Sequence, residues 1–69
     1  MSEKINNWFT YHSAETEDIP KYEAIRSAAK EFADVIEKNT PPSADQTAAF
    51  RKIREAVMTA NASIACKGK

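Results

Sequence analysis

Apolar side chains recur every third or fourth residue along two long stretches of the chain, with polar side chains between them. The first stretch repeats at Tyr22, Ile25, Ala29, Phe32 and Ile36. The second repeats at Phe50, Ile53, Val57, Ala60 and Ile64. This spacing places the apolar residues on one face of an α-helix. We therefore predict two amphipathic helices, over residues 19–38 and 44–67.

The polar stretch between these helices, residues 39–43, contains signals that end one helix and begin the next. Two adjacent prolines lack backbone donors and disfavour a helical residue before them, so the first helix must end by Asn39. Ser43 and Gln46 match the capping-box pattern at the start of a helix. A connection this short makes its two helices antiparallel neighbours. The sequence therefore predicts a helical hairpin.

A segment of different character, residues 1–18, precedes the hairpin. Residues 2–7 suit a short helical turn. The polar and acidic stretch at residues 13–18 favours a loop, in which Thr16 or Asp18 caps the first long helix. Pro20 then falls in the first turn of that helix, where its missing N–H does no harm.

The densest aromatic cluster of the chain lies in this segment, at residues 8–12. Alternation of side chains there suits an extended strand-like segment with an inner and an outer face. We expect Trp8 and Phe9 to close the open end of the hairpin core. Tyr11 and His12 carry polar atoms that need water or a partner, so we expect them to be exposed.

Small side chains cover further faces of the second helix, and Gly68 is a natural residue for the C′ position after its end. These small or slender positions are Ala49, Ala56, Met58, Ala62 and Ala65. Apolar area on more than one face cannot be hidden within one hairpin. We therefore predict an all-α fold in which an antiparallel two-helix hairpin assembles into a homo-oligomeric helical bundle.

The chain has 69 residues, with one cysteine and one histidine. A single core of this size rarely supplies more than about 3–5 kcal/mol, so small proteins commonly need an additional source of stability. One cysteine and one distant histidine provide neither a disulfide nor a zinc site. Oligomerisation is the remaining common solution, in agreement with the pattern of alanines.

Basic and acidic residues balance at ten each, which argues against a protein that binds duplex nucleic acid. No apolar run approaches the roughly 18 residues of a membrane span, and the N-terminus lacks the apolar core of a signal peptide. We expect a soluble intracellular protein.

No enzyme signature is recognisable. A single glycine excludes a glycine-rich phosphate loop, and no nucleophile has a neighbouring base. Cys66 is expected to be a small packed residue, and His12 a hydrogen-bonding loop residue. We predict neither catalytic residues nor a metal or other cofactor.

Aromatic and cationic side chains together suggest binding instead. Tyr11 and His12 lie in the N-terminal segment, whereas Arg26 and Lys30 share one helix face. Aromatic rings stack on nucleobases, and a guanidinium group matches phosphate oxygens. A solvated basic face beside ordinary aromatic residues is the alternative. Asn61 lies among alanines and either fixes a helix–helix contact or binds a ligand.

The order of several motifs resembles one family over nearly the whole chain. These motifs are Thr10-Tyr11-His12, Lys21-Tyr22-Glu23-Ala24-Ile25-Arg26, Pro41-Pro42-Ser43-Ala44-Asp45 and the stretch from Arg54 to Ala65. Together they are similar to the anti-CBASS cyclic-oligonucleotide sponges of phages and prophages, hairpin proteins related to a Thoeris anti-defence family. The resemblance implies a non-enzymatic homohexamer in the cytoplasm of a host bacterium. Such a protein would sequester cyclic dinucleotides of the cyclic GMP-AMP, di-AMP or di-GMP type, and for some members cyclic trinucleotides, and so block CBASS-type immune signalling.

The resemblance also implies roles for individual residues. Tyr11 would stack on a base and Arg26 would meet a phosphate. His12, Lys30 and Trp8 are secondary candidates at the same site. A trinucleotide site would use close-approach positions on the first helix, namely Ala24, Ser27 and Ala28.

A protein-interaction module is the alternative function. In that case, the extra apolar face of the second helix would dock on a host protein.

Overall fold

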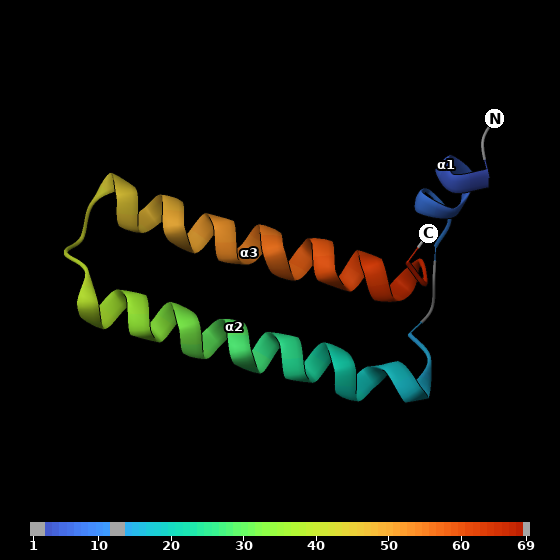
Figure 1. The fold of residues 1–69 in the computed structure, drawn as a ribbon, viewed down its shortest axis with the longest axis horizontal. Helices are drawn as coiled ribbons and strands as arrows, with labels where there is room; N and C mark the ends of the chain where they lie inside the picture. Colours follow the sequence, from blue (N-terminus) through green and yellow to red (C-terminus); the bar gives the residue numbers. More distant parts are fainter. Residues whose placement is uncertain (1–2, 12–13, 69) are drawn as a thin grey trace.

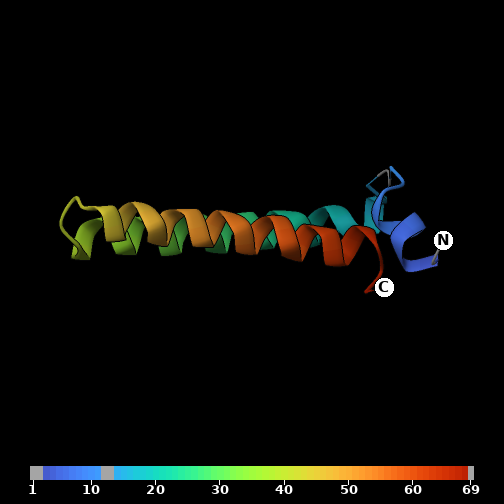
Figure 2. The same cartoon turned by 90° about the horizontal axis from the view of Figure 1, so that it is seen from above.

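The computed structural model describes residues 3–11 and 14–68, and within these ranges it is helical without strands. Two long helices run antiparallel, side by side, and the short N-terminal helix lies at the end opposite the turn (Figure 1). Seen from above, the long helices overlap in a single narrow layer (Figure 2). The predicted all-α hairpin is confirmed. Its elements are α1 (Glu3–Trp8), the 3-10 helix η1 (Thr16–Asp18), α2 (Ile19–Asn39) and α3 (Ala44–Ala65).

The turn between α2 and α3 is closed by side chains on both sides of the prolines. Ser43 Oγ accepts a hydrogen bond of 3.1 Å from the Gln46 backbone N–H, as the capping pattern predicts. The Gln46 side chain does not complete the box at Ser43. Its Nε2 donates instead to the carbonyl oxygen of Thr40 at 3.2 Å and to the hydroxyl of the same residue at 3.1 Å. Thr40 Oγ1 in turn donates to the Ile36 carbonyl at 2.7 Å, which satisfies an acceptor at the end of α2.

The start of α2 differs from the predicted cap. Pro20 lies in the first turn, as expected, but Asp18 at the N-cap position makes no side-chain capping bond. Its carboxylate accepts a hydrogen bond of 3.1 Å from Lys21 Nζ instead. Thr16 is not the cap either, because it begins η1. The carboxylate is drawn to the lysine one turn along α2, which leaves the first N–H groups of the helix without that side chain.

α3 ends two residues before the predicted boundary, in a Schellman motif. The backbone N–H of Lys67 donates to the Ile64 carbonyl at 3.1 Å, and that of Gly68 donates to the Ser63 carbonyl at 2.8 Å. Cys66 is the C-cap residue, so the left-handed C′ position falls on Lys67, with a φ of 56°. The prediction of Gly68 at C′ is therefore wrong by one residue.

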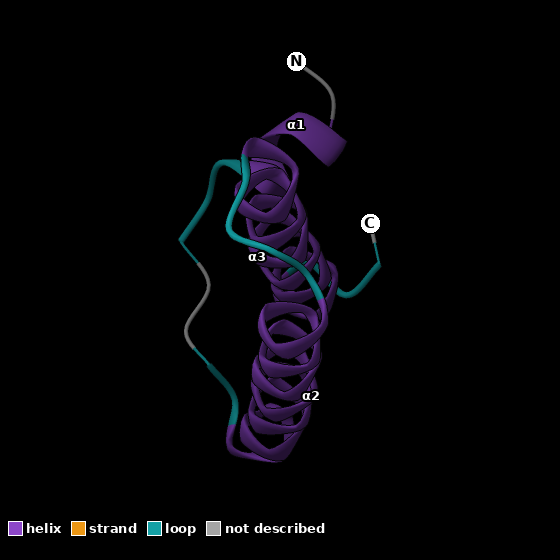
Figure 3. Cartoon of the chain, turned by 90° about the vertical axis from the view of Figure 1, so that its left-hand side faces the viewer, coloured by secondary structure: helices purple, strands orange, loops and turns teal. Residues whose placement is uncertain are grey.

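The hairpin buries little on its own. Cys66 and Asp18 are the only buried residues in the part of the chain that the structure describes. Phe32, Val35 and Met58 are more than half exposed, although they belong to the apolar faces of the long helices. Among the described residues, α2 and α3 form one layer, and no other helix packs along their length (Figure 3). The predicted homo-oligomeric bundle concerns several chains and stays a prediction.

The N-terminal segment is partly as expected. A short helix forms near the predicted turn, and Tyr11 is exposed. Trp8 is the last residue of α1 rather than part of an extended segment. Phe9 is 84% exposed, so the prediction that it closes the core is wrong. His12 lies outside the described residues.

Candidate functional site

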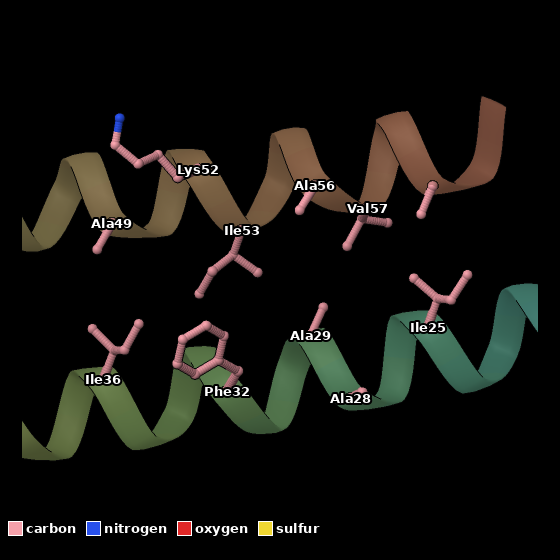
Figure 4. Close-up of a pocket in the computed structure, with 11 residues that line it drawn as sticks. Ile25, Ala28, Ala29, Phe32, Ile36, Ala49, Lys52, Ile53, Ala56 and Val57 are labelled. Atoms are coloured by element: carbon pink, nitrogen blue, oxygen red, sulfur yellow. The ribbon is translucent and has the colours of Figure 1, made fainter. Parts of the chain in front are cut away.

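An apolar groove of about 570 Å³ runs along the hairpin between α2 and α3. Ile36 and Phe32 of α2 face α3, and Ile53 of α3 points back between the helices (Figure 4). The lining of the groove is almost wholly aliphatic or aromatic. The lining residues are Ile25, Ala28, Ala29, Phe32, Ile36, Ala49, Lys52, Ile53, Ala56, Val57 and Ala60.

The groove has no polar group that could recognise a phosphate or a base. Lys52 is its one charged lining residue, and the amino group of that side chain points away from α2 (Figure 4). A polar ligand would lose water there without gaining hydrogen bonds, which is unfavourable. The groove can therefore bury apolar side chains, but it is not by itself a nucleotide site.

The polar chemistry lies at the open end of the hairpin, where α1 meets the last turn of α3. Asn7 Nδ2 donates to the Cys66 carbonyl at 3.2 Å. The Cys66 thiol lies 4.0 Å from the Asn7 carbonyl oxygen, at the limit of a weak S–H···O contact. These two contacts cover Cys66, which is only 8% exposed. The expectation that this cysteine is packed is confirmed.

A second contact ties the N-terminal segment to the same turn. Lys67 Nζ donates to Glu15 Oε1 at 3.1 Å, and both side chains stay largely exposed. The hydrogen bond with Glu15 and the charge of that carboxylate raise the pKa of Lys67 above the ordinary lysine value. Asn7 and Glu15 thus meet adjacent residues of the C-terminal turn.

A pocket of about 390 Å³ opens between α1 and α3, beside these contacts. Lys4 Nζ lies 5.0 Å from the centre of the Trp8 ring, within the range of a cation–π interaction. Thr59 and Ser63 line the facing side of the pocket on α3. Among the described residues, this is where an aromatic ring, a cation and two hydroxyl groups come together.

Sequence reasoning missed Lys4, Thr59 and Ser63 as candidate residues. A signal was present, because Lys4 and Trp8 are four residues apart, as are the two hydroxyl residues. Residues with that spacing share one helix face. The predicted extended segment conceals this spacing, because Trp8 belongs to α1.

The predicted dinucleotide residues occupy two different elements. Tyr11 lies in the segment between α1 and η1 and is 87% exposed. Arg26 and Lys30 are exposed on α2, one turn apart as predicted. Neither Tyr11 nor Arg26 lines the groove or the open-end pocket, whereas Trp8 lines the latter. One hairpin therefore does not enclose the Tyr11 and Arg26 side chains in a common pocket.

The remaining candidates lie on the long helices. Ala24 and Ser27 are exposed on α2, and Ala28 lines the groove. Asn61 is half-buried on α3, and its Oδ1 is shielded from solvent without a hydrogen-bond partner. An acceptor in that state normally finds a donor in the functional protein. Asn61 Oδ1 has no such donor within the described part of this chain.

Metal-binding and membrane-spanning features are absent from the described ranges, 3–11 and 14–68. No three histidine, cysteine, aspartate or glutamate side chains there gather closely enough to hold a metal ion. No helix in these ranges combines the length and the apolar character needed to cross a membrane.

Comparison with known proteins identifies a family but no individual relative. Neither the curated proteins nor the solved structures include a match to this chain. One protein family matches over residues 1–65, and it is described as the Acb2/Tad1 hairpin domain. The match spans α1, the connecting segment and nearly all of the hairpin, so the chain belongs to the Acb2/Tad1 hairpin-domain family of anti-defence proteins, which includes the anti-CBASS sponges.

Proposed function

We propose that this protein sequesters cyclic oligonucleotide messengers and so silences CBASS-type bacterial immune signalling. The observation that carries the proposal is the family match over residues 1–65. Sequestration needs binding without turnover, and the proposed site has no catalytic role. Inhibition would then be stoichiometric, so that tight binding and many copies of the protein are required.

Exposed aromatic and cationic side chains support a nucleotide ligand. The Tyr11 ring is accessible for stacking on a base, a contact worth about 1–3 kcal/mol. Arg26 can donate two parallel hydrogen bonds to phosphate oxygens, and Lys30 adds a second charge one turn away. Local cations of this kind can bind a small anion even though the whole chain has no net charge. His12 and Trp8 are further candidates at the same site.

The proposed site is completed by association of several chains, in a hexamer or another homo-oligomer. The apolar groove supports assembly, because a second chain can bury side chains that one hairpin leaves exposed. A two-fold interface would present the same Tyr11–Arg26 pair to each half of a cyclic dinucleotide. Burial between chains would also strengthen the bonds to the phosphates.

A cyclic trinucleotide would occupy a second kind of site, on α2 at Ala24, Ser27 and Ala28. Their small side chains allow a ligand or a neighbouring chain to approach the helix closely. Asn61 is a further candidate, and its shielded Oδ1 would reach a donor from the ligand or from that neighbouring chain only after its side chain rearranges.

A protein-interaction module is the second candidate function, and the same groove favours it. Its apolar lining would accept an amphipathic helix of a host protein as readily as a second copy of this chain. The two functions differ in solution, because the interaction module leaves the groove open in a monomer.

Thermal unfolding with a panel of cyclic di- and trinucleotides tests the proposal, together with mass measurement by light scattering on the same sample. A ligand that binds only the folded protein raises the melting temperature by mass action. We expect an oligomer whose melting temperature rises by several degrees with at least one cyclic dinucleotide. A monomer that no ligand stabilises would contradict the proposal and favour the interaction module. Intact ligand recovered after denaturation would support binding without hydrolysis.

A further inference from the structure

The open-end pocket between α1 and α3 is built from helix faces that the groove does not use. On α3 it is lined by Thr59, Ala62 and Ser63, which are three and four residues apart and so share one face of the helix. On α1 it is lined by Lys4 and Trp8, also four residues apart, and α1 lies beside the end of α3 (Figure 1). None of these five residues lines the groove against α2. The open-end pocket is therefore a separate hollow with a different lining.

The Trp8 ring borders this pocket without filling it. The residue is 52% exposed, and about 390 Å³ stays open between the two helices beside it. The facing residues of α3 carry small side chains, which leaves room in front of the ring. A pocket of this volume is within the range of small-molecule sites, and an accessible aromatic ring at its edge can stack on a planar ring of a ligand.

Lys4 determines the charge of the ligand that suits the pocket. Its Nζ lies 5.0 Å from the centre of the Trp8 ring, and no carboxylate of the described residues lies within ion-pair distance of it. Glu3 lines a neighbouring pocket together with Lys4 but does not line this one. The ammonium group would repel a cationic ligand, whereas an anionic group would gain a charge-assisted hydrogen bond. The pocket thus matches a ligand with one planar ring and one negative group.

We propose that the open-end pocket is a second binding site of this protein, which takes a nucleoside monophosphate. The base stacks on Trp8 and the phosphate accepts a hydrogen bond from Lys4. The Thr59 and Ser63 hydroxyls, which can donate or accept, bond to the sugar or to the phosphate. In the free protein the Lys4 ammonium group lies over the ring, so the base takes its place there. A weak exposed cation–π contact is exchanged for a base stack and a charge-assisted hydrogen bond.

This pocket is distinct from the proposed messenger site. Tyr11 and Arg26 do not line it, so Trp8 serves a site of its own rather than theirs. Its volume is near the low end of the range for small-molecule sites, which suits one nucleotide better than a cyclic dinucleotide. The pocket can take this ligand whether or not the protein sequesters cyclic messengers.

Trp8 fluorescence tests the proposal directly. Trp8 is the only tryptophan of the chain, so its emission reports on this pocket alone. We expect AMP and GMP each to quench the emission of the full-length protein along a saturable binding curve. Quenching that rises linearly with nucleotide concentration would reflect random collisions. That result, or no quenching at all, would overturn the proposal.

Substitution of Lys4 separates recognition of the phosphate from recognition of the base. Lys4→Met removes the charge and keeps an unbranched side chain. We expect the affinity for AMP to fall about fivefold, the upper value for an exposed ion pair. Adenosine lacks the phosphate and should bind as well as before or better, because no ammonium group competes for the ring. Equal losses for AMP and adenosine, or no loss for AMP, would overturn the proposal. Lys38→Met, in the last turn of α2, is the matched control and should change neither affinity.

Substitution of Thr59 tests the opposite side of the pocket. Thr59→Val removes the hydroxyl and keeps the branched shape of the side chain. We expect the affinity for AMP to fall about twofold to tenfold, the range for one hydrogen bond, with little change in melting temperature because Thr59 is exposed. A lower melting temperature with unchanged affinity would mean that this hydroxyl serves the fold, and would contradict its place in the site.

Failure of this site and failure of the proposed function give different results. The double variant Tyr11→Ala with Arg26→Ala should still bind AMP, and loss of AMP binding in that variant would overturn the separate pocket. If the unmodified protein binds a cyclic dinucleotide but AMP and GMP do not quench Trp8, the second site is wrong and the sponge function stands. If AMP binds but no cyclic nucleotide does, the sponge function is wrong and the second site stands.

Discussion

The two ends of the hairpin are both closed by hydrogen bonds, but the bonds differ in how far along the chain they reach. At the turn end, Gln46 bonds to Ser43 and Thr40, within six residues. At the open end, Asn7 bonds to Cys66 across 59 residues and Glu15 bonds to Lys67 across 52. The bonds at the turn end can form as soon as the residues around the turn fold. The second set forms only once the hairpin has brought the chain ends together.

This difference indicates that the two ends have different roles. The turn end defines the fold, because its prolines and caps stop one helix and start the next. The open end adds little burial beyond Cys66, and its contacts tie Asn7 of α1 and Glu15 to the last turn of α3. Changes at the turn end should therefore alter stability more than changes at the open end.

The largest expected effect is at the proposed ligand site. We expect Tyr11→Ala with Arg26→Ala to weaken binding of a cyclic dinucleotide at least about 100-fold, since a base stack and a charged hydrogen bond are lost together. The ligand-free melting temperature should hardly change, because both side chains are exposed. Isothermal titration calorimetry and thermal melting measure the two quantities. Affinity that survives the double substitution would exclude this site.

The opposite result is expected at the turn end. Ser43→Ala removes the acceptor for the Gln46 N–H and should cost about 1 kcal/mol of the free energy of unfolding. For a chain of this size, that corresponds to a fall in melting temperature of about 4–8 °C. Ligand affinity should remain within the error of the measurement. Ser43→Thr, which keeps a capping hydroxyl, is the control.

A smaller effect is expected from Asn7 at the open end. Asn7→Ala removes the bond to the Cys66 carbonyl and should cost about 0.5 kcal/mol, the low end for a hydrogen bond. Because the same contacts cover Cys66, its reaction with a thiol reagent should become faster. Faster labelling without a large fall in melting temperature would show that α1 can detach from α3 while the hairpin stays folded. Unchanged labelling would mean that Asn7 does not shield this thiol.

The smallest effect concerns pH. The raised pKa of Lys67 means that the folded protein holds this proton more tightly than the unfolded chain does. The pair therefore contributes its full stability below the ordinary lysine pKa of about 10.4, and loses it as the pH rises through the higher folded value. The difference in melting temperature between the unmodified protein and Lys67→Met should be constant from about pH 6 to 9 and should shrink above about pH 10.4. A difference that already shrinks at neutral pH would contradict this assignment.

The same contrast explains what could be predicted from the sequence. Helical periodicity and the two prolines were sufficient for the hairpin, because both act through neighbouring residues. Exposure of Tyr11 followed from the polar tip of its ring. The contacts of Asn7 and Glu15 could not be predicted, since nothing local relates residues more than 50 positions apart.

Competing partners close in the sequence account for other differences. Gln46 has acceptors at Thr40 as well as a donor at Ser43, and its Nε2 bonds to Thr40. Lys67 and Gly68 are neighbours, so the C′ position could shift by one residue. Phe9 follows the end of α1 directly and is exposed rather than packed in the core.

The contacts at the open end also impose an order of events during synthesis on the ribosome. Glu15 is made before its partner Lys67, which follows 52 residues later. At about 5–20 residues per second, that interval lasts roughly 3 to 10 s. A newly made chain can therefore complete its proline turn and begin to pair its helices before the open end is joined. The contacts across the open end would be the last that each copy acquires.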